Sequence, residues 1–236
     1  PDVGVVLNVA EDHLDWHGSM EAYAAAKAQV LTGRVAVAGV DDAWAARLLA
    51  DAPAPTRIGV RLGTPGPGEY GVLDGVLTAR AGEDDAPGGV ALLPAEEVRP
   101  PGPAGVLDAL AAAAVAMSVG ARPGHVAAAL RGFTVGAHRA EYVDTVDDVR
   151  YVDDSKATNP HAARTSLLAG GPMVWIAGGL LKGADVEPLV ADVAGVLRGV
   201  LLIGRDRDRI AAALARHAPS VPVVELASGD HDGAAA

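Results

Sequence analysis

Lysine is rare in this sequence, and the positions of its few lysines mark three candidate sites. Only three of the nineteen basic residues are lysines, namely Lys27, Lys156 and Lys182, so arginine is the ordinary surface cation of the chain. The two asparagines, Asn8 and Asn159, lie in the same neighbourhoods as Lys27 and Lys156. Each lysine therefore marks a stretch where an ammonium group could bind a phosphate or a carboxylate.

The first candidate site is the polar stretch 8–17, NVAEDHLDWH, which directly follows a strand-like segment. Carboxylates and imidazoles such as His13 at the carboxyl end of a strand can coordinate a divalent metal beside phosphates. A zinc hydrolase fits poorly: His13 and His17 have the spacing of two zinc ligands on a helix, but Leu14 stands where the catalytic Glu would be. A solvated polar loop is the other alternative.

Lys27 lies on the next predicted helix and could project back toward this stretch. An unmodified ammonium beside a metal ion would be repelled by it. A carbamate on the lysine nitrogen would reverse the charge and supply a metal ligand. An ordinary exposed helix lysine remains the alternative.

The second candidate site combines His138 and Arg139 with the stretch 153–160, DDSKATNP. A strand that ends at Asp154, followed by small hydroxyl residues and a helix start, offers a carboxylate for ribose hydroxyls, the Lys156 cation for phosphate and helix N–H groups for an anion. Thr158 or Asn159 could instead cap the helix, and the two interpretations are compatible.

The third candidate site is the stretch 178–185, GGLLKGAD, which also follows a predicted strand. Its glycines permit close approach of a backbone to a ligand, and Lys182 would place a positive charge there. The stretch is not a P-loop, and no Gly-x-x-x-x-Gly-Lys-Ser/Thr run occurs elsewhere in the sequence. If the chain serves ATP chemistry, the main phosphate cradle lies outside it.

Strand-like and helix-like stretches alternate in the first half, which predicts an α/β fold. The predicted strands are 3–9, 34–40 and 57–60, the predicted helices are 19–31, 42–49, 106–118 and 123–130, and a hairpin or meander is expected from 70–77 and 90–93. Ser19 is the predicted cap of the first helix, with Glu21 in its first turn.

A hinge at 132–136 introduces the second half, so we place a domain boundary between residues 133 and 134. The second half is predicted to contain a hairpin at 140–152, a helix after Asn159, strands at 173–177, 200–203 and 221–226, and helices at 186–197 and 207–217. Strands that alternate with helices indicate parallel βαβ units of the dinucleotide-binding type, whose ligands lie at the carboxyl ends of the strands.

Composition narrows the class of protein. Half of the residues are hydrophobic and 21% are charged, which predicts a folded globular chain. A net charge of -11 argues against a general nucleic-acid or anionic-membrane surface. The apolar run 106–121 contains Asp108 and is shorter than the roughly 18 to 20 residues of a membrane span, and no signal-peptide pattern is present. With no cysteine, disulfides and thiolate metal sites are excluded, and a cytoplasmic location is permitted.

Taken together, these stretches resemble the Mur ligase family, most closely its D-glutamate-adding branch of actinobacterial type. The resemblance rests on the stretches 7–15, 23–27, 101–103, 136–139, 153–159 and 178–183. The family has a UDP-binding domain, a central ATPase domain with the P-loop, and a Rossmann-like domain that binds the amino acid. The resemblance implies that 1–133 is the later part of the central domain and 134–236 the first part of the third, so we expect the chain alone not to turn over.

The resemblance also implies a role for each candidate residue. His13 would serve the magnesium and phosphate site, and Lys27, as a carbamate, would bind a second Mg²⁺. The remaining residues would be Arg139, Asp154 and Asn159 for ATP, with Asp154 at the ribose, and Lys156, Thr158 and Lys182 for D-glutamate and the reacting phosphate. The implied partners are ATP, UDP-N-acetylmuramoyl-L-alanine and D-glutamate, and the full-length protein is expected to be a monomer.

The sequence departs from many relatives at one motif, and it leaves two alternative functions open. Many relatives carry His-Asn after Pro-Gly-Pro, whereas this chain has Ala104-Gly105, which leaves the adenine contacts open. One alternative keeps the enzyme class and changes the substrate, to a sibling Mur ligase or a folylpolyglutamate-type ligase. The other is a non-catalytic module that retains a nucleotide or amino-acid pocket.

Overall fold

The computed structural model describes residues 1–80 and 88–226, which form two compact units. Unit 1 comprises Pro1–Ala10 and Ser19–Gly136, and unit 2 comprises Glu11–Gly18 and the chain from Ala137 onward. The domain boundary that we expect between residues 133 and 134 remains a prediction. No helix among the described residues is long and apolar enough to cross a membrane.

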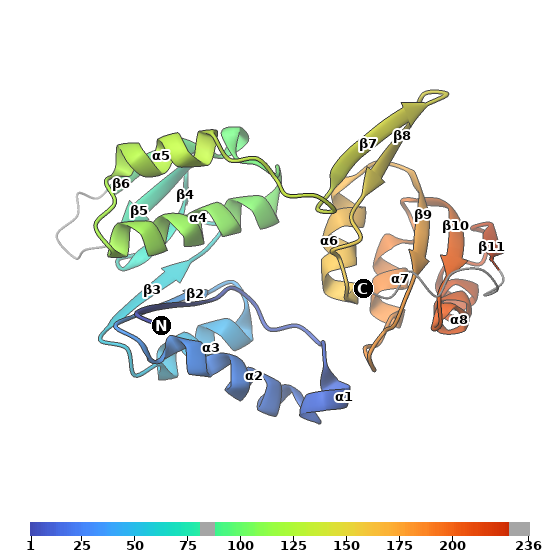
Figure 1. Ribbon diagram of the computed structural model, residues 1–236, viewed down its shortest axis with the longest axis horizontal. Helices are drawn as coiled ribbons and strands as arrows, with labels where there is room; N and C mark the ends of the chain where they lie inside the picture. Colours follow the sequence, from blue (N-terminus) through green and yellow to red (C-terminus); the bar gives the residue numbers. More distant parts are fainter. Residues whose placement is uncertain (81–87, 227–236) are drawn as a thin grey trace. The chain divides into compact units, whose positions relative to one another are not determined.

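Unit 1 is built on one six-stranded sheet with the strands in chain order (Figure 1). The strands are β1 (Val3–Val6), β2 (Val35–Gly39), β3 (Thr56–Val60), β4 (Glu69–Leu73), β5 (Val76–Arg80) and β6 (Val90–Pro94). Strands β1 to β4 pair in parallel, and β5 and β6 continue the sheet antiparallel. The first strand is shorter than expected, because its pairing with β2 ends at Val6.

The turn between β4 and β5 corrects the prediction of one strand-like piece at 70–77. Asp74 and Gly75 both have positive φ, 49° and 77°, and connect two antiparallel strands. An Asp-Gly pair in this conformation is the favoured two-residue hairpin turn, because its twist matches that of the flanking strands. The expected meander therefore has three strands.

Helices cover both faces of the unit 1 sheet. They are α2 (Met20–Ala28), the 3-10 turn η1 (Gln29–Thr32), α3 (Ala43–Asp51), the 3-10 turn η2 (Ala95–Glu97), α4 (Pro103–Ser118) and α5 (Pro123–Arg131). In Figure 1, α2 and α3 lie on one side of strands β1 to β3, and α4 and α5 lie on the other. The predicted cap is confirmed, since the Ser19 hydroxyl accepts a hydrogen bond from Ala22 N–H at 3.1 Å.

Strand β2 explains how two layers of helices fit on one sheet. Its sequence VAVAG is buried throughout. Val35 and Val37 belong to the core that contains the α4 side chains, whereas Ala36 and Ala38 belong to the core that contains the α2 and α3 side chains. The period-2 alternation thus places larger side chains on one face and alanines on the other.

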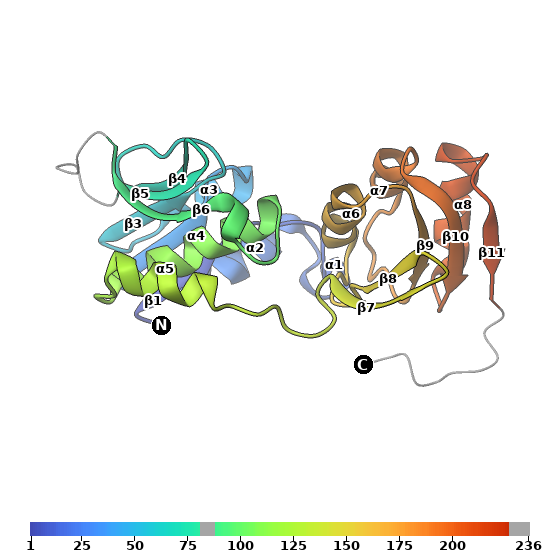
Figure 2. The same ribbon diagram turned by 90° about the horizontal axis from the view of Figure 1, so that it is seen from above.

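Unit 2 contains a three-stranded parallel sheet in the order β11-β10-β9 (Figure 2). Its strands are β9 (Met173–Gly178), β10 (Leu197–Ile203) and β11 (Val223–Glu225), and its helices are α1 (Leu14–His17), α6 (Pro160–Ala169), α7 (Glu187–Val193) and α8 (Arg207–His217). The predicted parallel βαβ pattern is confirmed. The residues that follow the predicted strand 221–226 lie outside the described residues.

The helix expected to reach residue 197 ends earlier. Helix α7 ends at Val193, and Leu197 is instead the first residue of β10, where it pairs with Met173. Leu197 is buried in the same core as Val190 and Leu202. An apolar run that passes from a helix into a buried strand carries no period that marks the boundary.

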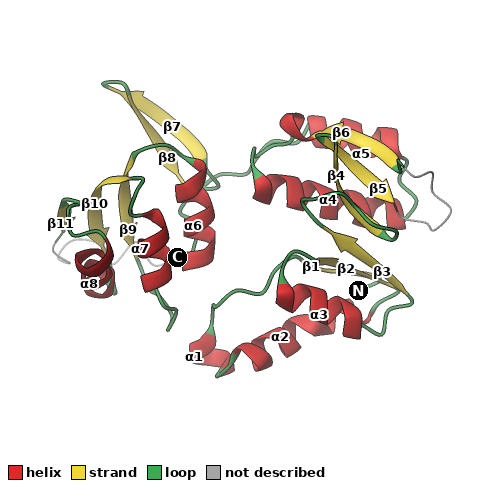
Figure 3. Ribbon diagram, turned by 180° about the vertical axis from the view of Figure 1, so that it is seen from behind, coloured by secondary structure: helices red, strands yellow, loops and turns green. Residues whose placement is uncertain are grey.

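A separate hairpin opens the second half of the chain (Figure 3). Strands β7 (Glu141–Val146) and β8 (Val149–Asp153) form a two-stranded antiparallel sheet, as the sequence predicts. Their turn uses Asp147 and Asp148, both with positive φ. Strand β8 leads directly into the stretch that carries the second candidate site.

Candidate functional site

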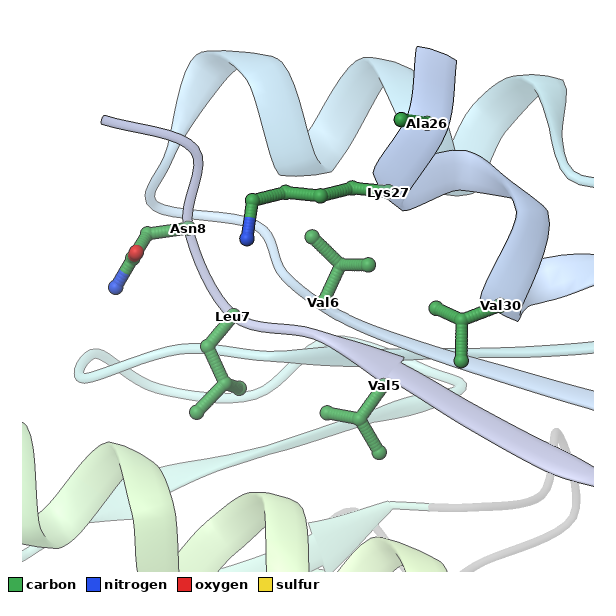
Figure 4. Close-up of a pocket in the computed structure, with 7 residues that line it drawn as sticks. All are labelled: Val5, Val6, Leu7, Asn8, Ala26, Lys27 and Val30. Carbon is green, nitrogen blue, oxygen red and sulfur yellow. The ribbon is translucent and has the colours of Figure 1, made fainter. Parts of the chain in front are cut away.

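A cavity of about 420 Å³ in unit 1 lies beside Lys27. It is lined by Val5, Val6, Leu7, Asn8, Ala26, Lys27 and Val30. Figure 4 shows the Lys27 side chain extending over Val6 toward Asn8. The Lys27 Nζ atom lies 4.7 Å from the centre of the Tyr23 ring, close enough for a cation–π contact. The lysine therefore reaches the segment that leaves the carboxyl end of β1.

Close backbone packing places helix α2 and Lys27 against β1. A Cβ atom at Gly4 would lie 1.8 Å from the Val30 carbonyl oxygen, so glycine is required for this approach. The next strand is equally close, because a Cβ at Gly39 would lie 2.1 Å from the Leu7 carbonyl oxygen. Two glycines thus set the geometry of the cavity.

The stretch 11–18 belongs to unit 2, and Asp12 connects it to distant residues of that unit. The Asp12 carboxylate accepts a hydrogen bond from His13 N–H at 2.9 Å and one from Asn159 Nδ2 at 3.4 Å. Lys182 Nζ lies 3.8 Å from Asp12 Oδ1, and only 14% of the Asp12 side chain is exposed. The structure therefore joins parts of all three sequence clusters through a residue that the sequence interpretation did not single out.

The second cluster follows β8, which ends at Asp153, one residue before the predicted end. Asn159 is the N-cap of α6, and its side-chain oxygen accepts from Ala162 N–H at 2.8 Å. Thr158 N–H donates to the Lys156 carbonyl at 2.9 Å, which keeps this loop compact. The capping interpretation of Asn159 is confirmed, while a ligand contact there remains a prediction.

The Asp154 carboxylate is fixed on both oxygens. Ala140 N–H donates to Oδ1 at 2.9 Å, and the Ser166 hydroxyl donates to Oδ2. A carboxylate has about four lone-pair sites, so Asp154 can still accept hydroxyl groups of a ligand.

The neighbouring carboxyl group, Asp153, is strongly acidic. His138 Nδ1 lies 2.7 Å from Asp153 Oδ2, and Ser155 N–H donates to Oδ1 at 2.9 Å. These contacts, the His138 hydrogen bond first, lower the pKa of Asp153 from 3.8 to about 2. Asp153 is therefore ionised at neutral pH.

The third cluster lies in the loop after β9. A Cβ at Gly178 would lie 2.1 Å from the Ile203 carbonyl oxygen, and Gly179 has a φ of 101°. Leu181 N–H donates to Asp206 Oδ2 at 2.7 Å, which ties the loop to the segment after β10. Lys182 itself has a φ of 50°, so the loop holds its backbone in an unusual conformation for a lysine.

The zinc alternative gains no support from the geometry. His13 precedes α1 with a φ of 52°, and His17 is the last residue of this four-residue helix. Within residues 1–80 and 88–226, the one group of three side chains placed to share a metal ion is His138, Glu141 and Asp153. A third ligand for the His13 and His17 pair is therefore missing from the described part of the chain.

Seven of the eight candidate residues lie in unit 2, and Lys27 lies in unit 1. Two of them share a partner: Asn159 donates a hydrogen bond to Asp12, and Lys182 forms an ion pair with the same carboxylate. Lys156 joins the base of the hairpin, since its N–H donates to the His138 carbonyl at 3.1 Å. For Arg139, the neighbours His138 and Ala140 fix the backbone on either side.

Comparison with known proteins agrees with the sequence resemblance. Residues 1–65 match the Mur ligase middle domain. The chain is 60% identical over 233 residues to the UDP-N-acetylmuramoylalanine--D-glutamate ligase of Mycolicibacterium smegmatis, which covers 99% of this chain and 46% of that protein. It is 57% identical to the protein of that name from Rhodococcus jostii, over 100% of this chain and 46% of the relative.

Solved structures support the fold. MurF from Acinetobacter baumannii matches 95% of this chain with a TM-score of 0.69 and 20% identity, over 51% of its own length. The UDP-N-acetylmuramate-alanine ligase MurC from Thermotoga maritima matches 96% with a TM-score of 0.63 and 17% identity, also over 51% of its length. The chain thus belongs to the Mur ligase family, with an α/β middle domain followed by further α/β structure, and spans about half the length of the curated relatives it matches.

Proposed function

We propose that this chain is part of an ATP-dependent ligase that joins D-glutamate to UDP-N-acetylmuramoyl-L-alanine in peptidoglycan synthesis. One observation carries the proposal: 60% identity across 99% of the chain to a protein named for this reaction. In these terms residues 1–133 supply the later part of the ATPase domain and residues 134–236 the first part of the amino-acid-binding domain. The reaction belongs to the cytoplasm, where ATP is available, and requires neither a membrane nor a nucleic acid.

The cavity beside Lys27 fits a magnesium site only if the lysine is modified. An ammonium group would repel Mg²⁺, whereas a carbamate on Nζ would present the oxygen ligands that this ion prefers. Lys27 lines the cavity of about 420 Å³ and its side chain reaches toward Asn8, so a carboxyl group added at Nζ would lie near Asn8. His13 would serve the magnesium and phosphate site from the stretch 11–18. When bound, Mg²⁺ neutralises the charge that builds up on the transferred phosphoryl group.

The loop after β8 suits the nucleotide. The Asp154 carboxylate, held by Ala140 and Ser166, would accept the ribose hydroxyls. Arg139 would contact the phosphates, because the Ala140 hydrogen bond holds its backbone beside Asp154. Asn159 would act from the helix start, with its side chain already bonded to Ala162 and Asp12.

The remaining side chains suit the amino acid and the reacting groups. Lys156 would lie against the transferred phosphate, and Thr158 and Lys182 would orient D-glutamate. Lys182 is 31% exposed and paired with Asp12 at 3.8 Å, a separation loose enough to exchange for a ligand carboxylate.

The proposed reaction has two balanced steps. The alanyl carboxylate oxygen attacks the γ-phosphorus of ATP, so that ADP leaves and an acyl phosphate forms. The amine of D-glutamate then attacks the acyl carbon through a tetrahedral intermediate, phosphate leaves, and an amide remains. Both steps concentrate negative charge, which the cations at 139, 156 and 182 would offset directly, and which the carbamate at Lys27 would help to offset by holding magnesium.

Two other functions compete with this one. A sibling ligase would keep the loops and change the amino acid, and a non-catalytic module would bind nucleotide without turnover. The test is release of phosphate from ATP by the complete gene product, with UDP-N-acetylmuramoyl-L-alanine, Mg²⁺ and one amino acid at a time. Release with D-glutamate alone supports the proposal. Release with another amino acid identifies a sibling ligase, and binding without release identifies the module.

A further inference from the structure

The base of the β7–β8 hairpin is closed by a network that the proposed ligand contacts do not use. His138 Nδ1 pairs with Asp153 Oδ2 at 2.7 Å, which joins the segment that leads into β7 to the last residue of β8. The His138 N–H also donates to Glu141 Oε2 at 2.7 Å. The segment that enters the hairpin is therefore held to the segment that leaves it.

The same network extends into the proposed nucleotide site. The His138 carbonyl accepts from Lys156 N–H at 3.1 Å, and Ala140 N–H donates to Asp154 Oδ1 at 2.9 Å. Arg139 lies between these two anchors. The backbone of one proposed ATP contact, Arg139, is thus fixed beside another, Asp154.

The backbone conformation requires such anchors. His138 and Ala140 have φ values of 64° and 49°, a region that side chains other than glycine seldom adopt. Strained residues persist where the surrounding contacts over-determine them, and they often mark functional sites. Here the contacts are the bonds to Asp153, Glu141 and Asp154.

A metal ion explains this cluster less well. The ligand atoms of His138, Glu141 and Asp153 lie within 4.8 Å of one another. However, His138 Nδ1 and Asp153 Oδ2 already bind each other, and Asp153 Oδ1 accepts from Ser155 N–H at 2.9 Å. A cation would have to break these bonds before it could coordinate the same atoms.

We infer that His138 and Asp153 are positioning residues that clamp the Arg139 segment onto the loop of Asp154 and Lys156 before nucleotide binds. The identity of the nucleotide as ATP rests on the proposed function. The clamp itself rests only on the hydrogen bonds described above.

The first test measures the clamp without any ligand. Amide hydrogen exchange in the 236-residue chain is followed by NMR at Ala140 and Lys156, whose N–H groups point into the network. In His138→Ala and in Asp153→Asn, both amides should exchange at least about tenfold faster, while amides of β10 keep their rates. Unchanged rates at Ala140 and Lys156 would overturn the clamp.

The second test measures its consequence for catalysis in the complete gene product. Each single variant should raise KM for ATP about tenfold, with kcat changed less than about threefold, because the contacts are displaced rather than removed. The double variant should also raise KM about tenfold instead of a hundredfold, since the two residues act as one pair. His138→Asn, whose amide N–H can take the place of Nδ1, should restore most of the affinity.

A matched control is available in the same unit. His217 Nε2 pairs with Glu187 Oε2 at the same separation of 2.7 Å, between α8 and α7, and neither residue bonds to the hairpin base. His217→Ala should leave KM for ATP unchanged. Faster exchange with an unchanged KM in the His138 and Asp153 variants would overturn the positioning role. If the unaltered protein shows no D-glutamate-dependent release, the proposed function fails, and the exchange rates still decide whether the clamp exists.

Discussion

The pKa of the Asp153 side chain can be measured directly. The His138 hydrogen bond, followed by the bonds from Ser155, lowers the pKa of Asp153 to about 2. Because the folded pKa lies below the ordinary 3.8, the stabilisation from ionised Asp153 is complete above that pH and is lost as pH falls toward 2. A carboxyl ¹³C NMR titration should show this low midpoint, and His138→Ala should move it upward. An unchanged midpoint in the variant would contradict the assigned cause.

We predict that the Lys27 side chain acts as a carbamate. In the complete gene product, Lys27→Ala should lower D-glutamate-dependent phosphate release by about a hundredfold or more, because a metal ligand is lost. Lys27→Arg is the matched control, since it keeps the positive charge and cannot form a carbamate. Both variants should fail equally. An active arginine variant would show that the charge alone is needed.

The rarity of lysine and asparagine predicted where the candidate residues lie in the sequence, but it did not predict which of them contact one another. The three lysines and two asparagines pointed to the three candidate sites, and the structure describes all of these residues. Asp12 was missed because its partner Asn159 lies 147 positions along the chain, a contact that spacing in one sequence cannot indicate. The His138–Asp153 pair was missed as a pair for the same reason, although both residues lay in the second cluster.

At the scale of elements, Gly4 decides where α2 and η1 lie. A methyl group at this position would meet the Val30 carbonyl at 1.8 Å, and backbone cannot move aside as a flexible side chain can. Gly4→Ala should lower the free energy of unfolding of unit 1 by about 2 kcal/mol or more. Chemical denaturation measures this change.

Gly63→Ala is the control for that substitution. No heavy atom lies within 4 Å of a Cβ at Gly63, so the free energy of unfolding should change by less than about 0.5 kcal/mol. Equal losses in the two variants would show that close packing at Gly4 is not the cause.

Most elements could be predicted because their sequences keep one period from end to end. The alternating VAVAG of β2 and the capped start of α2 are examples. The predictions failed where a change of element left the apolar run unbroken, as between α7 and β10, or where an Asp-Gly turn interrupted an alternating pattern, as at Asp74.

At the scale of the whole molecule, each unit has hydrophobic core clusters of its own. Leu202 is fully buried in the core cluster that the described residues of unit 2 form, among side chains of α7, α8 and β10. Leu202→Ala should therefore destabilise unit 2 by about 2 to 5 kcal/mol. Hydrogen exchange should speed up at amides of β9 and β10 while those of β2 keep their rates. Equal acceleration in both units would show that they unfold as one.

The α/β class and the Mur ligase resemblance followed from the sequence, because several motifs recur in one order over most of its length. The packing of 11–18 with the second half did not follow from it, since that depends on contacts between distant parts of the chain. Amino-acid choice belongs to the proposed function, and the chain spans only about half the length of the relatives on which that proposal rests.

Oxygen transfer decides whether ligation proceeds through an acyl phosphate. UDP-N-acetylmuramoyl-L-alanine labelled with ¹⁸O in both carboxylate oxygens is incubated with ATP, Mg²⁺, D-glutamate and the complete gene product. Ligation by this route should place one ¹⁸O atom in the released phosphate and leave the other in the new amide, as mass spectrometry would show. Phosphate without ¹⁸O, or no amide product with D-glutamate, would contradict ligation by this route.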